Sequence, residues 1–93
     1  MAVAEICIFP LGTQTPSVGE YLEPVFEVIK DSGLKYMTCP MGTVVEGDID
    51  EILALIKKCH EAIFKTGARR VVISLRIDDR KDKELTIESK LGV

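Results

Sequence analysis

The side chains with the strongest potential for ligand chemistry lie in residues 39–46, the octapeptide CPMGTVVE. A Pro-Met-Gly corner separates strand-forming residues there, and Thr43 and Glu46 place a hydroxyl and a carboxylate beside it. Since side chains alternate along a strand, Thr43 is expected on one face and Glu46 on the other. The Glu46 carboxylate either faces solvent or a partner, or it receives a ligand that is positively charged or donates hydrogen bonds.

No arrangement typical of catalysis or metal binding accompanies this corner. The three cysteines, Cys7, Cys39 and Cys59, have neither CxxC nor Cys/His zinc spacing, so we expect them to fill a reduced core. The single histidine, His60, follows Cys59 on a predicted helix, where adjacent side chains point about 100° apart. We expect His60 at the edge of an apolar stripe, although contact with a ligand stays open. The sequence therefore predicts a protein that is not an enzyme and has no metal site or cofactor.

Size and composition indicate a single domain over residues 1–93. Of the 93 residues, 46% are hydrophobic and 29% are charged, as is typical of globular proteins. No apolar run approaches the roughly 20 residues of a membrane helix, and the N-terminus has no export signal, so we expect a cytoplasmic protein. A net charge of −3 argues against a nucleic-acid partner, because phosphate binding normally requires a basic patch.

Hydrophobic periodicity predicts four strands and two helices. Alternating side chains indicate strands over residues 3–11, 34–39, 43–46 and 70–78. Capping boxes predict the helix starts, with Ser17 and Glu20 forming the first box and Asp48 and Glu51 the second. The apolar stripes run to glycines at positions 33 and 67, which are typical helix ends. Pro24 lies inside the first helix and should bend its first turns.

The order strand–helix–strand–strand–helix–strand predicts a ferredoxin-like α+β sandwich, a four-stranded antiparallel sheet with two helices on one face. The opposite face would mix polar and apolar side chains, Cys7, Phe9 and Val72 among them. A half-apolar sheet face on so small a domain favours self-association of two or more copies through their sheets.

Three other activities of this fold are disfavoured by the sequence. Acylphosphatase chemistry needs an Asn, and the chain contains none. Metallochaperones carry a CxxC loop after the first strand, where this chain has residues 12–16, GTQTP. RNA-binding domains stack bases on aromatic side chains of the central strands, and the predicted third strand has no aromatic residue.

The hairpin also resembles a known family. Residues 40–47, PMGTVVEG, are similar to the P-M-x-T-x-(I/V)-E-G hairpin of the small thiamine-binding proteins related to YkoF. His60-Glu61, residues 67–71 (GARRV) and residues 77–80 (IDDR) resemble the H-E, G-A-x-R-V and I-D-x-R pattern of its second half. The resemblance implies a ferredoxin-like domain that forms homo-oligomers, commonly tetramers, and binds thiamine or its hydroxymethylpyrimidine portion without chemistry.

The resemblance further implies a pocket formed by Met41, Thr43 and Glu46, with residues of the first strand nearby. The residue types suit such a ligand, because Met37 and Met41 offer soft apolar walls to a flat ring. A thiazolium cation favours a carboxylate or an aromatic face, which Glu46 or Tyr36 would supply.

A different interpretation needs no ligand. Met41 would plug the core at the corner, Thr43 would be an ordinary β-branched strand residue, and Glu46 would pair with Arg76 on a neighbouring strand. The chain would then be a structural or regulatory interaction module, with the apolar sheet face as its functional surface.

Overall fold

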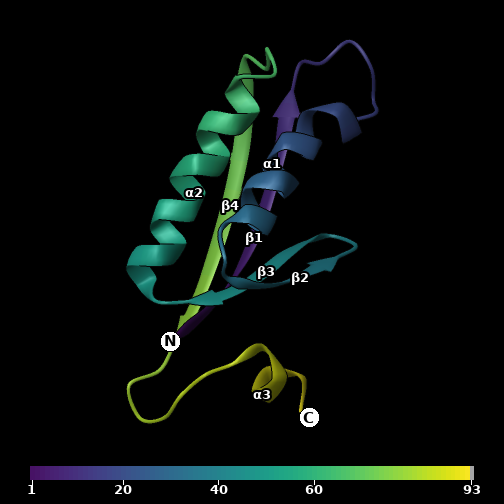
Figure 1. Ribbon diagram of the computed structural model, residues 1–93. Helices are drawn as coiled ribbons and strands as arrows, with labels where there is room; N and C mark the ends of the chain where they lie inside the picture. The colour runs from purple at the N-terminus through teal and green to yellow at the C-terminus, as the bar shows by residue number, and fades with distance from the viewer. Residues whose placement is uncertain (93) are drawn as a thin grey trace.

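The computed structural model describes residues 1–92, over which the chain forms four strands and three helices (Figure 1). Val93, the last residue of the predicted single domain, lies outside the described residues. The elements in chain order are β1 (Ala2–Leu11), α1 (Gly19–Asp31), β2 (Lys35–Cys39), β3 (Gly42–Gly47), α2 (Ile49–Phe64), β4 (Arg70–Asp79) and α3 (Ile87–Leu91). No helix within residues 1–92 combines the length and the apolar character needed to cross a membrane.

The strands form one antiparallel sheet in the order β2-β3-β1-β4, which confirms the predicted ferredoxin-like α+β fold. Helices α1 and α2 lie side by side on one face of this sheet (Figure 1). Ile6, Val45, Ile52 and Ile63 are buried in the core between the helices and the sheet. The alternation of side chains along β1, β3 and β4 sends their larger aliphatic residues to this core.

Strands β1 and β4 extend beyond the hairpin. β1 pairs with β4 along ten residues, from Ala2↔Asp79 to Leu11↔Arg70. Its pairing with β3 ends at Ile6↔Thr43. The second half of β1 therefore has a strand neighbour on one side only, and Figure 1 shows β1 and β4 rising together past the β2–β3 hairpin.

One of the two predicted capping boxes is present in the structure, and the other is not. At α2 the predicted capping box is confirmed, since the Asp48 backbone N–H donates to the Glu51 carboxylate at 3.0 Å. At α1 the predicted Ser17 box is wrong, because the helix begins one residue later, with Val18 as its N-cap. The Ser17 backbone N–H instead donates to the Thr15 hydroxyl at 3.2 Å, within the preceding loop.

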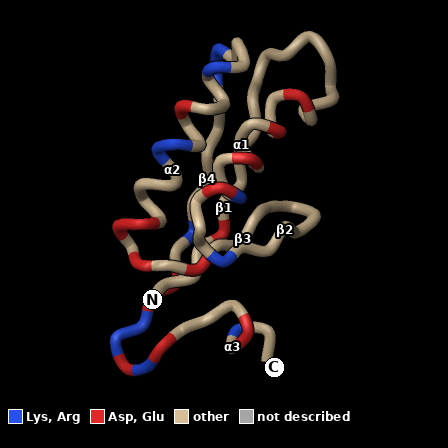
Figure 2. The backbone as a smooth tube through the Cα atoms, in the orientation of Figure 1, with Lys and Arg blue, Asp and Glu red and all other residues tan. Residues whose placement is uncertain are grey.

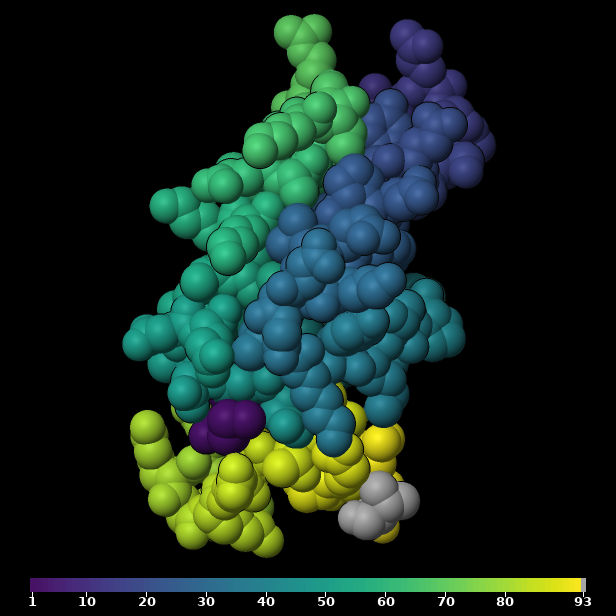
Figure 3. All heavy atoms as spheres, in the orientation of Figure 1, coloured from purple at the N-terminus to yellow at the C-terminus, as the bar shows by residue number. Residues whose placement is uncertain are grey.

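A C-terminal segment, residues 85–92, covers part of the sheet face opposite α1 and α2. Leu85 and Ile87 are buried there against Val3, with Met37 and Val44 packed alongside. The short helix α3 is capped by Thr86, whose hydroxyl accepts from the Ser89 backbone N–H at 3.0 Å. In Figure 3 this segment packs against the end of the domain where the N-terminus lies.

Candidate functional site

The β2–β3 hairpin directs its polar side chains to opposite faces of the sheet. Thr43 lies on the face covered by the helices and is 4% exposed. Glu46 lies on the other face, in register with Val3 of β1 and Lys35 of β2. Met41, in the turn between the strands, is 85% exposed, so the alternative in which it plugs the core is wrong. Thr43 and Glu46 therefore lie on opposite faces of the sheet and do not share one pocket.

A pocket of about 260 Å³ opens beside the hairpin, where β1 continues past the end of β3. The hairpin contributes its turn and Thr43 to the lining. Strand β1 contributes residues 6–9, and α1 contributes apolar side chains that include Leu22 and Phe26. The pocket therefore joins three elements that lie far apart in the sequence.

The lining of this hairpin pocket is uncharged and mostly apolar. Two aromatic side chains, Phe9 of β1 and Phe26 of α1, belong to it, and Phe26 is 45% exposed. The hydroxyl of Thr43 is the only hydroxyl in the lining. An apolar cavity with few polar groups is typical of small-molecule sites, in which those groups fix the orientation of the ligand.

The Glu46 carboxylate holds the C-terminal segment and does not line the hairpin pocket. Its Oε1 accepts a hydrogen bond from the Ile87 backbone N–H at 2.7 Å. The expected pairing of Glu46 with Arg76 is wrong, because the Arg76 guanidinium lies 3.2 Å from the Glu5 carboxylate on the adjacent strand. The Glu46 carboxylate, which the sequence suggested as an acidic contact for the ligand, thus already has a partner within the chain.

Met37 and Tyr36 also lie outside the hairpin pocket. Met37 shares the face of Glu46 and lines a second pocket, of about 420 Å³, between the sheet and α3. Tyr36 is 41% exposed on the edge strand β2, opposite Val45. Of the five residues predicted from the sequence, the structure brings Met41 and Thr43 together in the hairpin pocket.

The charges near the second pocket are paired. Lys90 of α3 binds the Asp78 carboxylate of β4, and Lys35 of β2 binds the Glu88 carboxylate of α3. Together with the Glu46 hydrogen bond, these contacts tie the C-terminal segment to three strands. This side of the sheet is therefore stabilised by interactions inside the chain.

The remaining candidates for chemistry do not form a catalytic or metal site. Burial raises the pKa of the Cys59 thiol to about 11, so this thiol stays protonated near neutral pH. The exposed His60 ring contacts Phe64 edge to face, with 4.8 Å between the ring centres. Within the described chain no group of three His, Cys, Asp or Glu side chains is arranged to hold a metal ion.

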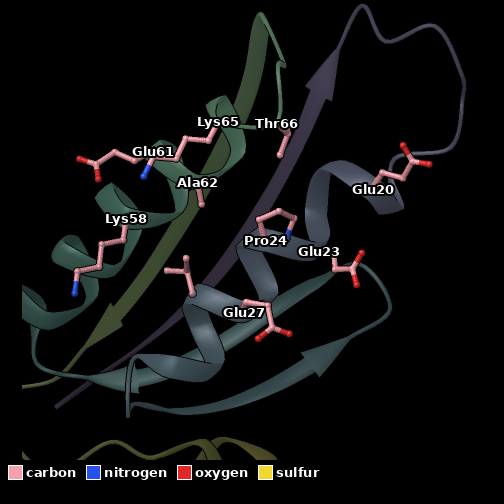
Figure 4. Close-up of a pocket in the computed structure, with 10 residues that line it drawn as sticks. Glu20, Glu23, Pro24, Glu27, Lys58, Glu61, Ala62, Lys65 and Thr66 are labelled. Atoms are coloured by element: carbon pink, nitrogen blue, oxygen red, sulfur yellow. The ribbon is translucent and has the colours of Figure 1, made fainter.

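A third hollow is an open groove between α1 and α2. Its walls carry Glu23 and Glu27 on α1 and Lys58, Glu61 and Lys65 on α2. Figure 4 shows these charged side chains diverging from one another instead of meeting at a common centre. Figure 2 likewise shows acidic residues spread along α1 and mixed charges along α2. Because its charged side chains do not converge on one point, we interpret this groove as ordinary solvent-exposed surface and not as a binding site.

Sequence reasoning missed the contribution of α1 to the hairpin pocket. Phe26 belongs to the apolar stripe of the predicted first helix, so the pattern placed it in the core. Its high exposure beside a cavity is visible only after the helix is packed on the sheet. The signal available beforehand was the presence of a large aromatic side chain in a chain with few aromatic residues, 5% in total.

Comparisons with known proteins address the family resemblance and the fold. Residues 4–93 match the thiamine-binding protein family. YqgV of Bacillus subtilis, a UPF0045 protein, is 42% identical over 95 residues, which cover 98% of this chain and 91% of YqgV. MJ1052 of Methanocaldococcus jannaschii, another UPF0045 protein, is 52% identical over 89 residues, 96% of this chain and 87% of its own.

Solved structures of relatives have the same fold. The crystal structure of MJ1052 matches with a TM-score of 0.90 at 50% identity, covering 98% of this chain and 92% of that one. TM0486 of Thermotoga maritima, provisionally assigned to thiamine biosynthesis or salvage, matches with a TM-score of 0.86 at 28% identity, covering 98% and 95%. The match over nearly the whole length shows that this chain belongs to the thiamine-binding protein family.

Proposed function

We propose that this protein binds thiamine or its hydroxymethylpyrimidine precursor in the hairpin pocket, without catalysing a reaction. The observation that carries the proposal is the position of the pocket. It opens beside the hairpin whose sequence resembles the thiamine-binding family, and Met41 and Thr43 of that hairpin line it. Membership of the family and the resemblance to TM0486 point to the same class of ligand.

The chemistry of the pocket suits a flat, electron-poor ring. Phe26 and Met41 provide an aromatic face and a polarisable thioether for stacking. The Thr43 hydroxyl is able to donate to a ring nitrogen or to accept from an amino group. A volume of about 260 Å³ is at the lower end for ligand sites, and it fits one aminopyrimidine ring better than a large cofactor.

The thiazolium ring of thiamine would lie toward the open side of the pocket. The ring of Phe26, which is 45% exposed, is accessible there and attracts a cation through its ring electrons. No carboxylate lines the pocket, so this attraction would take the place of the acidic contact expected from Glu46. Contacts of Glu46, Met37 and Tyr36 with the ligand stay predictions, which their positions outside the pocket do not favour.

We further propose that the protein acts as a homo-oligomer, a dimer or a tetramer. The C-terminal segment covers only part of the sheet face opposite the helices. Phe9 and Cys7 of β1 and Val72 and Ser74 of β4 share the uncovered part, in direct register. A second copy would bury this mixed surface, as small domains with one free sheet face commonly do. An interaction module without a ligand would use the same surface.

Isothermal titration calorimetry tests the binding function. We expect saturable heat when thiamine or hydroxymethylpyrimidine is added to the purified protein. Thr43→Val keeps the shape of the side chain but removes its hydroxyl, so it should weaken binding about tenfold. Thr38→Val is the matched control, because Thr38 pairs with Thr43 across the hairpin but lies outside the pocket lining. Absence of heat at millimolar ligand would leave the interaction module as the better function.

A further inference from the structure

The hairpin pocket has a feature besides its side chains, a free backbone edge. Strand β1 pairs with β4 as far as Leu11, but its pairing with β3 stops at Ile6. Residues of β1 beyond Ile6 therefore have no strand on the β3 side. This side is where the pocket opens, since Cys7, Ile8 and Phe9 all belong to its lining.

The direction of the backbone groups identifies Ile8 as the residue that faces this gap. The Ile6 carbonyl oxygen points toward β3, because it lies 3.1 Å from the position that a β-carbon on Gly42 would take. Backbone N–H and C=O groups of successive strand residues point alternately to the two sides. Ile8, two residues after Ile6, therefore directs its N–H and C=O toward the pocket side.

Within residues 1–92, neither group has a strand partner on the β3 side. Apart from the bonds inside helices and the sheet, no backbone hydrogen bond within residues 1–92 involves Ile8. Ile8 belongs to the lining of the hairpin pocket, so a molecule in that pocket can reach its backbone edge. A backbone N–H and C=O that face a pocket and no strand are available to hydrogen-bond a ligand.

We propose that the Ile8 backbone N–H and C=O bind the aminopyrimidine edge of the ligand, as a neighbouring strand would. This inference rests on the proposed function and names the contact that orients the ring. An aminopyrimidine presents a ring-nitrogen acceptor next to an amino donor, which complements an N–H next to a C=O. The ring would lie between Phe26 and the hairpin turn, with its edge against β1.

A small ring fits this edge better than an added peptide strand. The next residue that faces the same side is Pro10, which has no backbone N–H. An added strand would therefore find one donor at Ile8 and none at the following position. A single planar ligand needs only the one donor and its neighbouring acceptor.

NMR spectroscopy of the full-length, ¹⁵N-labelled protein tests the proposal with two probes. One probe is hydroxymethylpyrimidine, and the other is the same compound without the amino group. With the first probe, we expect the Ile8 amide proton to move downfield. The Ala4 amide, which faces the same side but is already paired with β3, serves as the internal control. The compound without the amino group should bind at least about tenfold more weakly, because the Ile8 carbonyl then loses its donor.

The Thr43→Val variant separates backbone recognition from side-chain recognition. In this variant the Ile8 shift and the tenfold preference for the amino compound should both persist, even if overall affinity falls. Saturable binding that leaves the Ile8 amide unmoved would overturn the backbone contact but leave the proposed function intact. If neither probe binds at millimolar concentration, both the contact and the proposed function fail.

Discussion

The hairpin pocket and the C-terminal segment are two regions in which polar groups meet an apolar surface, but they differ in how those groups are paired. Beneath the segment, Glu46 accepts a hydrogen bond from Ile87, and the surrounding charges form ion pairs. In the hairpin pocket the lining is uncharged, and the backbone of Ile8, although paired with β4, has no strand on the β3 side. A polar group that is already paired stabilises the fold, whereas an unpaired one is available to a ligand. We therefore assign a structural role to the first region, and recognition in the second is what the proposed function requires.

The largest expected difference between the core and the hairpin pocket is in the rates at which their cysteines are alkylated. Cys7 and Cys39 line the hairpin pocket, whereas Cys59 is fully buried and its pKa is raised to about 11. At pH 8 we expect Cys59 to react with iodoacetamide on the order of 10³-fold more slowly than the other two, because it must first be exposed by unfolding. Mass spectrometry of digested samples measures the three rates.

Added ligand sharpens the same experiment. Saturating hydroxymethylpyrimidine should slow the alkylation of Cys7 and Cys39, since both border the occupied space. Equal rates with and without ligand, under conditions in which calorimetry detects binding, would place the ligand elsewhere.

Truncation of a buried side chain in the C-terminal segment should affect stability and spare binding. Ile87→Ala removes a buried aliphatic side chain from the cluster with Val3 and Leu85, so we expect the free energy of unfolding to fall by about 2–4 kcal/mol. Urea denaturation measures this change. Leu91→Ala is the control, because Leu91 is 60% exposed and its loss should cost less than about 0.5 kcal/mol. A matching loss of affinity in folded Ile87→Ala would mean that the segment takes part in recognition.

Two phenylalanines, one on each long helix, test whether the ligand binds in the hairpin pocket. Phe26→Ala removes a stacking face from the hairpin pocket and should weaken binding about tenfold, as loss of an aromatic platform under a base does. Phe64 of α2 has a similar exposure but lies outside the pocket, so Phe64→Ala should leave the dissociation constant unchanged. Calorimetry on both variants decides, and equal losses would count against this pocket.

The smallest expected effect comes from neutralising the Glu46 carboxylate. Glu46→Gln keeps an oxygen acceptor for the Ile87 N–H but removes its charge, so the free energy of unfolding should fall by about 1 kcal/mol. The dissociation constant for thiamine should stay within about twofold of the wild-type value. A tenfold weaker affinity would instead make Glu46 a ligand contact and erase the distinction between the two regions.

The sequence predicted the sheet, the two long helices α1 and α2 and their order because the apolar periods are long and regular, but it did not predict α3. It also placed Thr43 and Glu46 on opposite faces, although their proximity along the chain suggested one shared pocket. What it could not predict was the partner of Glu46. A five-residue helix such as α3 is unstable alone and forms only through tertiary packing, so its position depends on the sheet being assembled first. The contribution of Phe26 likewise depends on how α1 lies across β1.

The long pairing of β1 with β4 has a consequence for biosynthesis. Ala2 lies opposite Asp79, so the first strand emerges from the ribosome long before its principal neighbour has been translated. Closing a loop of this length is entropically costly, and contacts between distant residues slow folding. The apolar residues of β1 therefore stay without their β4 partner until residues 70–79 have been translated, and exposed apolar strand residues are prone to aggregate during that interval.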